Sequence, residues 1–298
     1  MSNPRVLCLG EILYDVLADQ LGRSVSEVDS WTSYPGGAPA NVACALVKLG
    51  TPSAFIGAVG EDEPGKSLVK LLEEVGVDTD GVQLNSEAPT RLVLVTRKEN
   101  GDRVFSGFKD YDTAEFADTR LKAAELPEKL FVNADFLVIG TLELAYPETG
   151  AAVYQALELA SQHNVKILLD VNWRDVFWKN PDAAPDKIRE LIKKVDFLKL
   201  AKEEAELLFN TYDAGAITYR LNSVEGVLVT DGDKGCAYCL GENEDKFSAF
   251  SVPVVDTTGA GDSFVAGFVH QLLQTGIQNL KDAEVVKKII AYASAAGA

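Results

Sequence analysis

The 298-residue sequence predicts an α/β fold in which a mostly parallel β-sheet is covered by helices and carries a smaller β layer. Short apolar runs alternate with longer amphipathic segments along most of the chain, a pattern typical of strand–helix–strand units. Residues 12–35 and 89–110 break this alternation, because they lack helical periodicity and are rich in β-forming residues. Since no tandem repeat or Pro/Ser-rich linker divides the chain, we expect one domain over residues 1–298, with these two segments inserted as a lid.

The individual elements follow from the same patterns, taken in chain order. Short apolar runs between turn residues predict buried strands at residues 5–9, 53–58, 136–139, 166–170 and 196–200. Apolar residues at helical spacing predict helices at 64–75, which Gly76 ends, and at 148–163. The segment KENGDR (98–103) predicts a hairpin turn within the lid. The last third predicts three antiparallel closing strands and then two helices, at residues 224–230, 235–240, 246–252, 259–274 and 281–296.

The composition limits the class of partner. Hydrophobic residues make up 47% of the chain and charged residues 24%, which is enough for a sizeable core. The formal net charge of −17 would repel nucleic acids and anionic membranes. We therefore expect small-molecule ligands, and any bound phosphate must be held by local donors and bound cations.

Targeting signals and cysteine usage predict a cytoplasmic protein. The N-terminal residues MSNPRVLCLGEIL do not have the pattern of a secretory signal, and no run of eighteen apolar residues is present. Cys236 and Cys239 form a C-x-x-C pair, but no second pair or histidine cluster accompanies them, so we do not expect a zinc site. Buried free thiols are typical of a reducing compartment.

The segment VDTTGAGDSFVAGF (255–268) carries the strongest chemical signal in the chain. Small residues at the start of a helix leave backbone N–H groups accessible, and together with the helix dipole these donors bind anions, most often phosphate. Gly259, Ala260 and Gly261 are therefore a candidate anion hole, and Asp262 in the same first turn is a candidate proton acceptor. The alternative is that Asp262 only stabilises the helix dipole, by about 0.3–1 kcal/mol.

A second glycine-rich segment, GEDEPGKS (60–67), matches the P-loop pattern, but we do not expect a phosphate there. Pro64 has no N–H to donate. The three acidic residues Glu61, Asp62 and Glu63 would also repel a polyanion.

The segment GGAPANVACALVKLG (36–50) is a candidate sugar site. Gly36 and Gly37 allow a ligand to approach the backbone, and Asn41 offers both a donor and an acceptor, as sugar hydroxyls require. Asp15 lies in an otherwise apolar strand. It either faces water at a sheet edge or accepts hydrogen bonds from two sugar hydroxyls.

Together these segments resemble the ribokinase-like (PfkB) family of carbohydrate kinases over essentially the full chain. GGAPANVA resembles the family's N-terminal signature, DTTGAGDSFVAG its C-terminal signature, and AVGEDEPG (58–65) a glycine motif of the family. DVNWR (170–174) and KLAKEEAELL (199–208) resemble the fructokinase branch in particular. The resemblance implies a three-layer α/β/α sandwich with a small β lid, and the activity of an ATP-dependent sugar kinase.

The resemblance also implies roles for individual residues. Asp262 would be the general base, and the backbone of Gly259, Ala260 and Gly261 would form the anion hole. The implied sugar contacts are Asp15, Gly36, Gly37, Asn41, Arg91 on the lid, and Arg174. The implied nucleotide contacts are Lys199, Thr230, Gly232 and Gly235.

The family binds magnesium together with ATP, and its N-x-x-E motif orders the water around the metal. Glu204 keeps the acidic position of that motif, whereas Ala201 replaces the asparagine. Many members also use potassium near the anion hole, which implies Asp256 and Thr258 as ligands. The second potassium loop normally follows the last helix, and the sequence stops at Ala298, where that loop would begin. The resemblance thus implies ATP and Mg²⁺ as cofactors, with K⁺ as a further candidate.

The expected reaction is that of a fructokinase, in which D-fructose and ATP give fructose 6-phosphate and ADP. The nearest rival substrate is 2-keto-3-deoxygluconate, whose carboxylate would require a cation such as Arg91 or Arg174. Another ribokinase-like sugar kinase ranks lower. A different class is an inactive kinase-like protein that serves in an assembly, but such a protein would be expected to lose the base or the glycines, and this chain keeps both.

The lid carries apolar residues that could pair with a second lid in a homodimer. They are Leu92, Leu94, Val104 and Phe105. The alternative is that they pack against the chain's own sheet.

Overall fold

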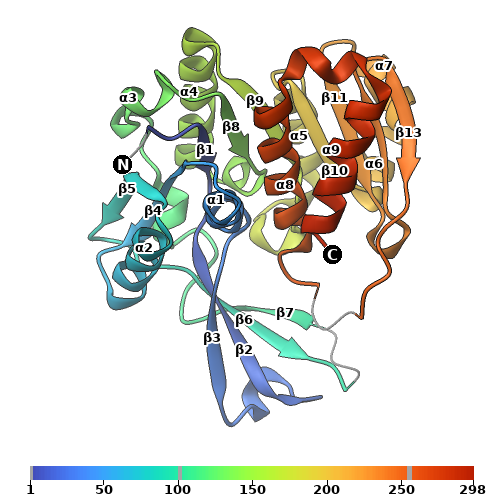
Figure 1. Ribbon diagram of the computed structural model, residues 1–298. Coiled ribbons are helices and arrows are strands. Elements are labelled where there is room, and N and C mark those ends of the chain that lie inside the picture. Colours follow the sequence, from blue (N-terminus) through green and yellow to red (C-terminus); the bar gives the residue numbers. More distant parts are fainter. Residues whose placement is uncertain (1–2, 100–102, 254–256) are drawn as a thin grey trace.

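The computed structural model describes residues 3–99, 103–253 and 257–298. They form a sandwich of three layers, with a central β-sheet between two layers of helices, and a smaller separate sheet (Figure 1). Within these residues the central sheet has nine strands, in the order β13-β12-β11-β10-β9-β8-β1-β4-β5. Neighbouring strands are parallel from β11 to β5, and the hairpin of β12 and β13 closes the sheet in antiparallel fashion. The mostly parallel sheet predicted from the sequence is confirmed. Its strands are β1 (Val6–Leu9), β4 (Ser53–Gly60), β5 (Asp78–Asn85), β8 (Phe136–Ile139), β9 (Lys166–Asp170), β10 (Phe197–Ala201), β11 (Gly226–Thr230), β12 (Cys236–Leu240) and β13 (Asn243–Phe247).

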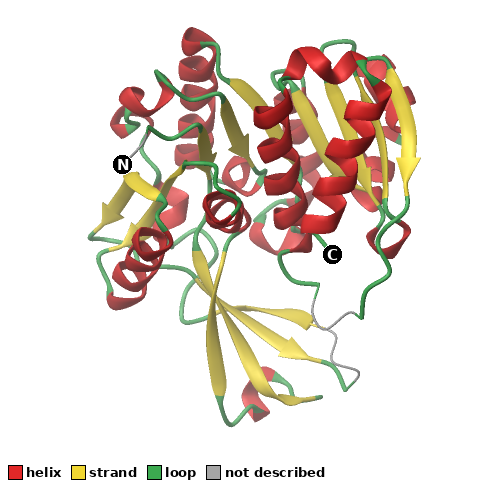
Figure 2. Ribbon diagram, in the orientation of Figure 1, coloured by secondary structure: helices red, strands yellow, loops and turns green. Residues whose placement is uncertain are grey.

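Helices cover both faces of this sheet, and each face has its own hydrophobic core (Figure 2). Because successive side chains of a strand point to opposite faces, Leu7 and Leu9 of β1 join one core while Val6 and Cys8 join the other. The Val6 face is covered by α1 (Ala38–Lys48), α2 (Glu63–Val75), α8 (Ala260–Thr275) and α9 (Ala283–Ala296). The Leu7 face is covered by α3 (Glu128–Phe131), α4 (Pro147–His163), α5 (Ala184–Ile192), α6 (Lys202–Phe209) and α7 (Ala214–Leu221).

The small sheet contains four strands, in the order β3-β2-β6-β7. Its strands are β2 (Leu13–Leu21), β3 (Trp31–Gly36), β6 (Leu92–Arg97) and β7 (Arg103–Phe108). All four lie in the two β-rich segments that the sequence sets apart, and β6 pairs with β7 as the hairpin signal predicts. Figure 1 shows this sheet projecting from the end of the central sheet at which α1 and α8 begin.

Two strands differ from the sequence-based expectation. Strand β5 was not predicted, because its residues DTDGVQLN are mostly polar and only Gly81 is buried. It forms as an edge strand by pairing with β4. The last strand of the closing set was predicted at 246–252, but β13 ends at Phe247 because the hairpin turns immediately after Leu240, which pairs with Asn243.

The cysteine pair and the false P-loop have structural roles. Cys236 and Cys239 lie three residues apart on β12 and therefore belong to opposite cores, so they cannot share a metal ion. Asp62 caps α2 by accepting hydrogen bonds from the N–H groups of Gly65 and Thr90, both at 2.8 Å. Among the residues that the structure describes, no helix has the length and apolarity needed to cross a bilayer.

Candidate active site

Five parallel strands (β1, β8, β9, β10 and β11) bring the candidate site residues to one edge of the central sheet. Since parallel strands end on the same side, the residues that follow them lie close together, and ligands of open α/β sheets bind at this carboxyl edge. The chain leaves β1 here and enters the small sheet through only three residues, Gly10 to Ile12. The small sheet therefore adjoins the edge at which the predicted chemistry lies.

Asp262 and Asn41 come from helices that are far apart in the sequence and meet at this edge. Asp262 is in the first turn of α8, and its Oδ2 accepts a hydrogen bond of 2.8 Å from Nδ2 of Asn41 in α1. The pKa of Asp262 is raised to about 6, chiefly by burial and also by Asp170, while Asn41, Lys199 and Arg174 act in the opposite direction. A carboxylate with this pKa is ionised at neutral pH and can still accept a proton efficiently.

The backbone before α8 has the conformation that an anion site requires. Gly259 adopts the left-handed region (φ 76°, ψ 0°), which an L-residue rarely occupies, and its carbonyl accepts a hydrogen bond from Ser263 N. The N–H of Ala260 donates to Thr257 O at 3.2 Å. Of the three predicted anion-hole amides, Ala260 would therefore have to break a bond in order to join, whereas Gly261 is a first-turn residue without an intrahelical acceptor.

Lys199 and Asp170 form a buried ion pair below this turn. Their Nζ and Oδ1 atoms are 2.9 Å apart, and each side chain is 7% exposed. A Cβ atom built on Gly261 would lie 3.4 Å from the Lys199 ammonium, so this cation is directly beside the candidate anion hole. Although burial alone would lower the pKa of Lys199, Asp170 and Glu204 raise it, and the group stays charged.

Of the predicted sugar contacts, Asn41 and Arg174 act directly on Asp262, whereas Asp15, Gly36 and Gly37 lie at the start of the small sheet and the turn into α1. A Cβ on Gly36 would lie 3.1 Å from Oδ2 of Asp15, so the glycine leaves room beside this carboxylate. Burial raises the pKa of Asp15, which is not the behaviour of an edge residue that faces water. Gly37 has φ 106°, and a Cβ there would overlap the Glu11 carbonyl at 2.4 Å, so the turn into α1 requires glycine. The exposed Arg174 is close enough to lower the pKa of Asp262.

Arg91 corrects one of the predictions. The side chain is 1% exposed, and it donates two hydrogen bonds to the Asp118 carboxylate, at 2.6 and 2.8 Å. The guanidinium also donates hydrogen bonds to the hydroxyl and the carbonyl of Thr113 and to the hydroxyl of Tyr146. The guanidinium is also enclosed by the rings of Phe108, Phe116, Tyr146 and Phe177 at 4.6–5.7 Å. Arg91 is thus a buried structural cation at the base of β6 and does not reach a sugar site.

Three of the four residues predicted for the nucleotide, Thr230, Gly232 and Gly235, lie at or just after the end of β11, whereas Lys199 lies on β10. Thr230 pairs with Ala201 of β10 in the sheet register, and its hydroxyl bonds the Leu200 carbonyl at 3.3 Å. Gly232 and Gly235 shape the turn into β12, and both have positive φ. A Cβ on Gly235 would lie 1.9 Å from Phe247 O, so packing alone requires glycine at this position, whether or not a nucleotide binds there.

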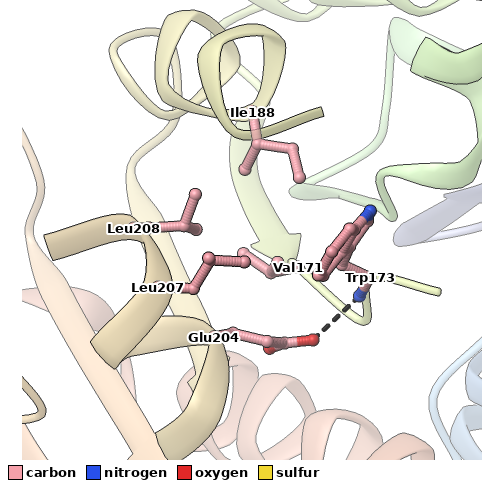
Figure 3. A pocket seen from close by; sticks show the side chains of 6 residues that line it. All are labelled: Val171, Trp173, Ile188, Glu204, Leu207 and Leu208. Atoms are coloured by element: carbon pink, nitrogen blue, oxygen red, sulfur yellow. Dashed lines mark hydrogen bonds between the residues drawn. The ribbon is translucent and has the colours of Figure 1, made fainter. Parts of the chain in front are cut away.

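Glu204, predicted to order water around the metal, uses both carboxylate oxygens within the protein, and Figure 3 shows one of these hydrogen bonds, from the backbone N–H of Trp173. Oε1 accepts from Trp173 N at 2.8 Å and Oε2 from Ala201 N at 2.7 Å. Burial raises its pKa. The adjacent hollow is lined mainly by apolar side chains and is too narrow to admit a water molecule. Glu204 therefore connects the loop after β9 to the start of α6. A metal-bound water would have to share Glu204 oxygens that already accept hydrogen bonds.

Only one of the two residues predicted to bind potassium lies in the part of the chain that the structure describes. Asp256 lies outside the described residues. Thr258 directly precedes Gly259, so a cation bound at its carbonyl would be adjacent to the anion hole.

Sequence reasoning missed a pair of buried glutamates under the Gly36–Gly37 turn. Glu11 follows β1, and its Oε1 accepts a hydrogen bond of 2.8 Å from Ala38 N at the start of α1. Burial raises the pKa of Glu11 to about 7 and that of its partner Glu143 well above the ordinary value. Burial thus favours the neutral form of both carboxyl groups. The available signal was an acidic residue directly after a fully buried strand.

Asp170 was also missed as a site residue, although its segment DVNWR had been singled out. Its signal was a carboxylate that ends a buried parallel strand. The sequence position of Asp170 or Glu11 does not predict which side chain will contact its carboxylate.

Three comparisons with known proteins show which family and fold the chain is similar to. Residues 3–298 match the profile of the family described as pfkB family carbohydrate kinase. The chain is 35% identical to "Probable fructokinase-5" of Arabidopsis thaliana, over all of this chain and 91% of that protein. It is 34% identical to "Fructokinase-2" of Zea mays, over 99% of this chain and 88% of that protein. The crystal structure of fructokinase with bound ATP from Xylella fastidiosa superposes with a TM-score of 0.88 at 28% identity, covering 98% of this chain and 90% of that one.

Proposed function

Because the chain belongs to the pfkB family of carbohydrate kinases, and so is a sugar phosphotransferase, we propose that its acceptor is D-fructose and its product fructose 6-phosphate. The observation that carries the reaction type is the Asp262 carboxylate, held by Asn41 beside the glycine turn of α8. The choice of fructose is supported by eight curated relatives at 32–35% identity, which are named fructokinases or probable fructokinases and match 98–100% of this chain.

In the proposed mechanism Asp262 accepts the proton of the sugar CH₂OH group as its oxygen attacks the γ-phosphorus of ATP. The bond to the β,γ-bridging oxygen breaks, and ADP leaves with the electron pair. The Gly259 and Gly261 amides and the Lys199 ammonium take up negative charge on the transferred group, so positioning and electrostatics supply most of the rate enhancement. Asp15, the Gly36–Gly37 turn, Asn41 and Arg174 orient the sugar, and Thr230, Gly232 and Gly235 adjoin the nucleotide.

We propose Mg²⁺ as the divalent metal that accompanies ATP, where it would neutralise phosphate charge. Such sites use one or two carboxylates together with water and phosphate oxygens. Glu204 is the candidate carboxylate, acting through water. Potassium at Thr258 and Asp256 is a further proposal, to be tested by comparing rates in potassium and sodium buffers.

The small sheet is proposed to act as a lid that covers the sugar. It adjoins the carboxyl edge and carries Asp15 toward Gly36. Closure would exclude water, which competes for the phosphoryl group.

Pairing of two lids in a homodimer is a separate proposal. It is supported by the partial exposure of Val104 (36%) and Phe105 (40%) on β7. Sedimentation of the wild type and of a Val104→Glu variant would test it, because a lid-mediated dimer should weaken in the variant.

The decisive experiment is a coupled assay and mass-spectrometric screen of ATP with fructose, ribose, 2-keto-3-deoxygluconate and adenosine. Fructose should give the highest kcat/KM, and Asp262→Asn should lower kcat by about 10²–10⁴-fold, since general-base catalysis contributes that much. The variant should remain folded, because it removes a carboxylate whose burial is unfavourable. An Asp262→Asn enzyme with near wild-type turnover would remove Asp262 from the role of base.

A second acceptor, 2-keto-3-deoxygluconate, is favoured by one observation. Arg174 is exposed at the site, and no acidic side chain among the described residues forms an ion pair with it. If a sugar acid is the acceptor, Arg174→Gln should raise the KM for the sugar acid far more than the KM for fructose.

A further inference from the structure

The ion pair of Lys199 and Asp170 is built into the central sheet. The two residues are register partners on the adjacent strands β10 and β9. The neighbours of Lys199 along β10, Leu198 and Leu200, belong to the core on the far face, so Lys199 points toward α8. Asp170 follows the same alternation on β9, because Leu169 and Val171 belong to that far core. Both side chains therefore extend from rigid strands toward the first turn of α8.

Two carboxylates are available to this one buried ammonium. Asp170 contacts it at 2.9 Å. Asp262 directly follows Gly261, whose Cβ position is 3.4 Å from Nζ, and its charge also acts on Lys199. In the structure the Asp262 carboxylate is instead turned to Asn41, at 2.8 Å.

A direct Lys199–Asp262 pair would weaken the base. A cation next to an aspartate lowers its pKa by roughly 1–3 units, and a carboxylate with a lower pKa accepts a proton less readily from a hydroxyl. It would also withdraw the ammonium from the anion hole, where it is needed as charge develops on the transferred group.

We propose that Asp170 is a positioning residue, which holds Lys199 beside the Gly261 amide and keeps it from pairing with the Asp262 carboxylate. This inference rests on the proposed function, in which Asp262 is the base. It assigns Asp170 a role that acts through Lys199 and not through contact with the substrate. Besides Lys199, the charged groups that face Asp262 are Asp170 itself and Arg174.

The test is a titration of the Asp262 carboxyl carbon by ¹³C NMR in the ligand-free protein, with its signal assigned by its loss in Asp262→Asn. Asp170→Asn should lower the apparent pKa of Asp262 by about one unit or more, because Lys199 then pairs with Asp262. Lys199→Met should raise it, because the nearest cation is lost. In a Lys199→Met background Asp170→Asn should have little further effect, since Asp170 then has no ammonium to hold away from Asp262.

The acid limb of the pH–rate profile should move in the same directions, with kcat lowered and the sugar KM changed less than about threefold in Asp170→Asn. Asp170→Glu should restore part of both effects. Because Asp170 also raises the pKa of Asp262 through its own charge, an Asp170→Asn shift that persists in the Lys199→Met background would show that Asp170 acts directly and not through Lys199. A shift of the same sign in Asp170→Asn and Lys199→Met, or no shift in either, would overturn the inference.

Asp196→Asn is the matched control. Asp196 pairs with Lys166 at 2.8 Å at the opposite end of the same two strands, so its loss removes an Asp–Lys pair away from the first turn of α8. Failure of the proposed function and failure of this inference give different results. A wild type without sugar kinase activity would contradict the proposed function. An active wild type whose Asp262 titration ignores Asp170 defeats only this inference.

Discussion

At the scale of single residues, the site depends on how burial adjusts three acids at the carboxyl edge. Burial raises the pKa of Asp262 to about 6 and that of Glu11 to about 7, and it also raises that of Asp15. In each case the water that would stabilise the anion has been replaced by protein. Asp262 is the one whose carboxylate adjoins the glycine turn, so its ionisation is the one expected to govern turnover.

The pH dependence of the wild type follows from that value. Asp262 must be ionised to accept a proton, and its folded-state pKa lies above the ordinary value, so kcat/KM should fall as the pH drops through about 6. An unperturbed aspartate would keep activity down to about pH 4. The measurement is a profile from pH 4.5 to 8.5 with a check that the protein stays folded; activity that is level down to about pH 4.5 would contradict it.

Arg91 makes a second residue-scale prediction, on stability. Arg91→Met would leave Asp118 buried without its cation, and breaking a buried pair in this way costs about 3–5 kcal/mol. Chemical unfolding should show this loss. Arg5→Met is the control, because Arg5 and Asp135 form a surface pair with side chains 41% and 44% exposed, worth about 0–1 kcal/mol. Similar losses of unfolding free energy in the two variants would mean that the buried Arg91–Asp118 pair contributes no more to stability than a surface pair.

At the scale of elements, the aromatic contacts at the base of the small sheet connect it to the loop that carries Arg174. Phe105 and Phe108 of β7 meet the ring of Phe177 edge-on, with centroids 6.1 and 5.4 Å apart. Phe177 ends the short helical turn that begins after Arg174, and its N–H donates to the Arg174 carbonyl. Docking of the proposed lid and placement of Arg174 are therefore mechanically linked.

Phe105→Ala tests this link at low cost to stability. The ring is 40% exposed, so the change should cost about 1 kcal/mol in unfolding free energy. A lid that docks less well admits water, so the ratio of ATP hydrolysis to sugar phosphorylation should rise on the order of several-fold. Tyr219→Ala, on the far helix α7 with 88% exposure, should leave the ratio unchanged. An unaltered ratio in Phe105→Ala would mean that this contact does not control closure.

At the scale of the whole molecule, a chain with a net charge of −17 must bind a polyanion. The long-range field opposes ATP, and the proposed attraction is local, chiefly from the amides before α8 and the Lys199 ammonium. Exposed charges are screened over about 10 Å at 0.1 M salt, whereas the buried Lys199 is screened much less. Salt should therefore weaken the repulsion more than the attraction.

The KM for ATP should accordingly fall when ionic strength rises from about 0.02 to 0.2 M, on the order of twofold or more. The KM for an uncharged sugar should change little. Steady-state kinetics at fixed Mg²⁺ and K⁺ would measure both. A KM for ATP that rises with salt would show that local cations outweigh the field at long range.

Local pattern was enough for most of the architecture and for the centre of the site. Apolar runs predicted the strands now numbered β1, β4, β8, β9 and β10 to within two residues, because buried parallel strands must be nearly continuous in apolar residues. The polar β5 escaped prediction, because only pairing with β4 makes it a strand. The glycines before Asp262 predicted a turn and a helix start, since a left-handed residue at position 259 requires glycine.

The sequence by itself determined the mostly parallel α/β sheet, the two β-rich insertions and the acid placed after a glycine turn, because each depends on residues close together in the chain. Only the tertiary structure decided which distant groups meet. It turned Asn41 toward Asp262 across 221 residues, paired Lys199 with Asp170 and enclosed Arg91 with Asp118. The reason is that a buried charge takes the partner that the packing brings within reach, and that choice depends on strand order and register, which no local pattern encodes.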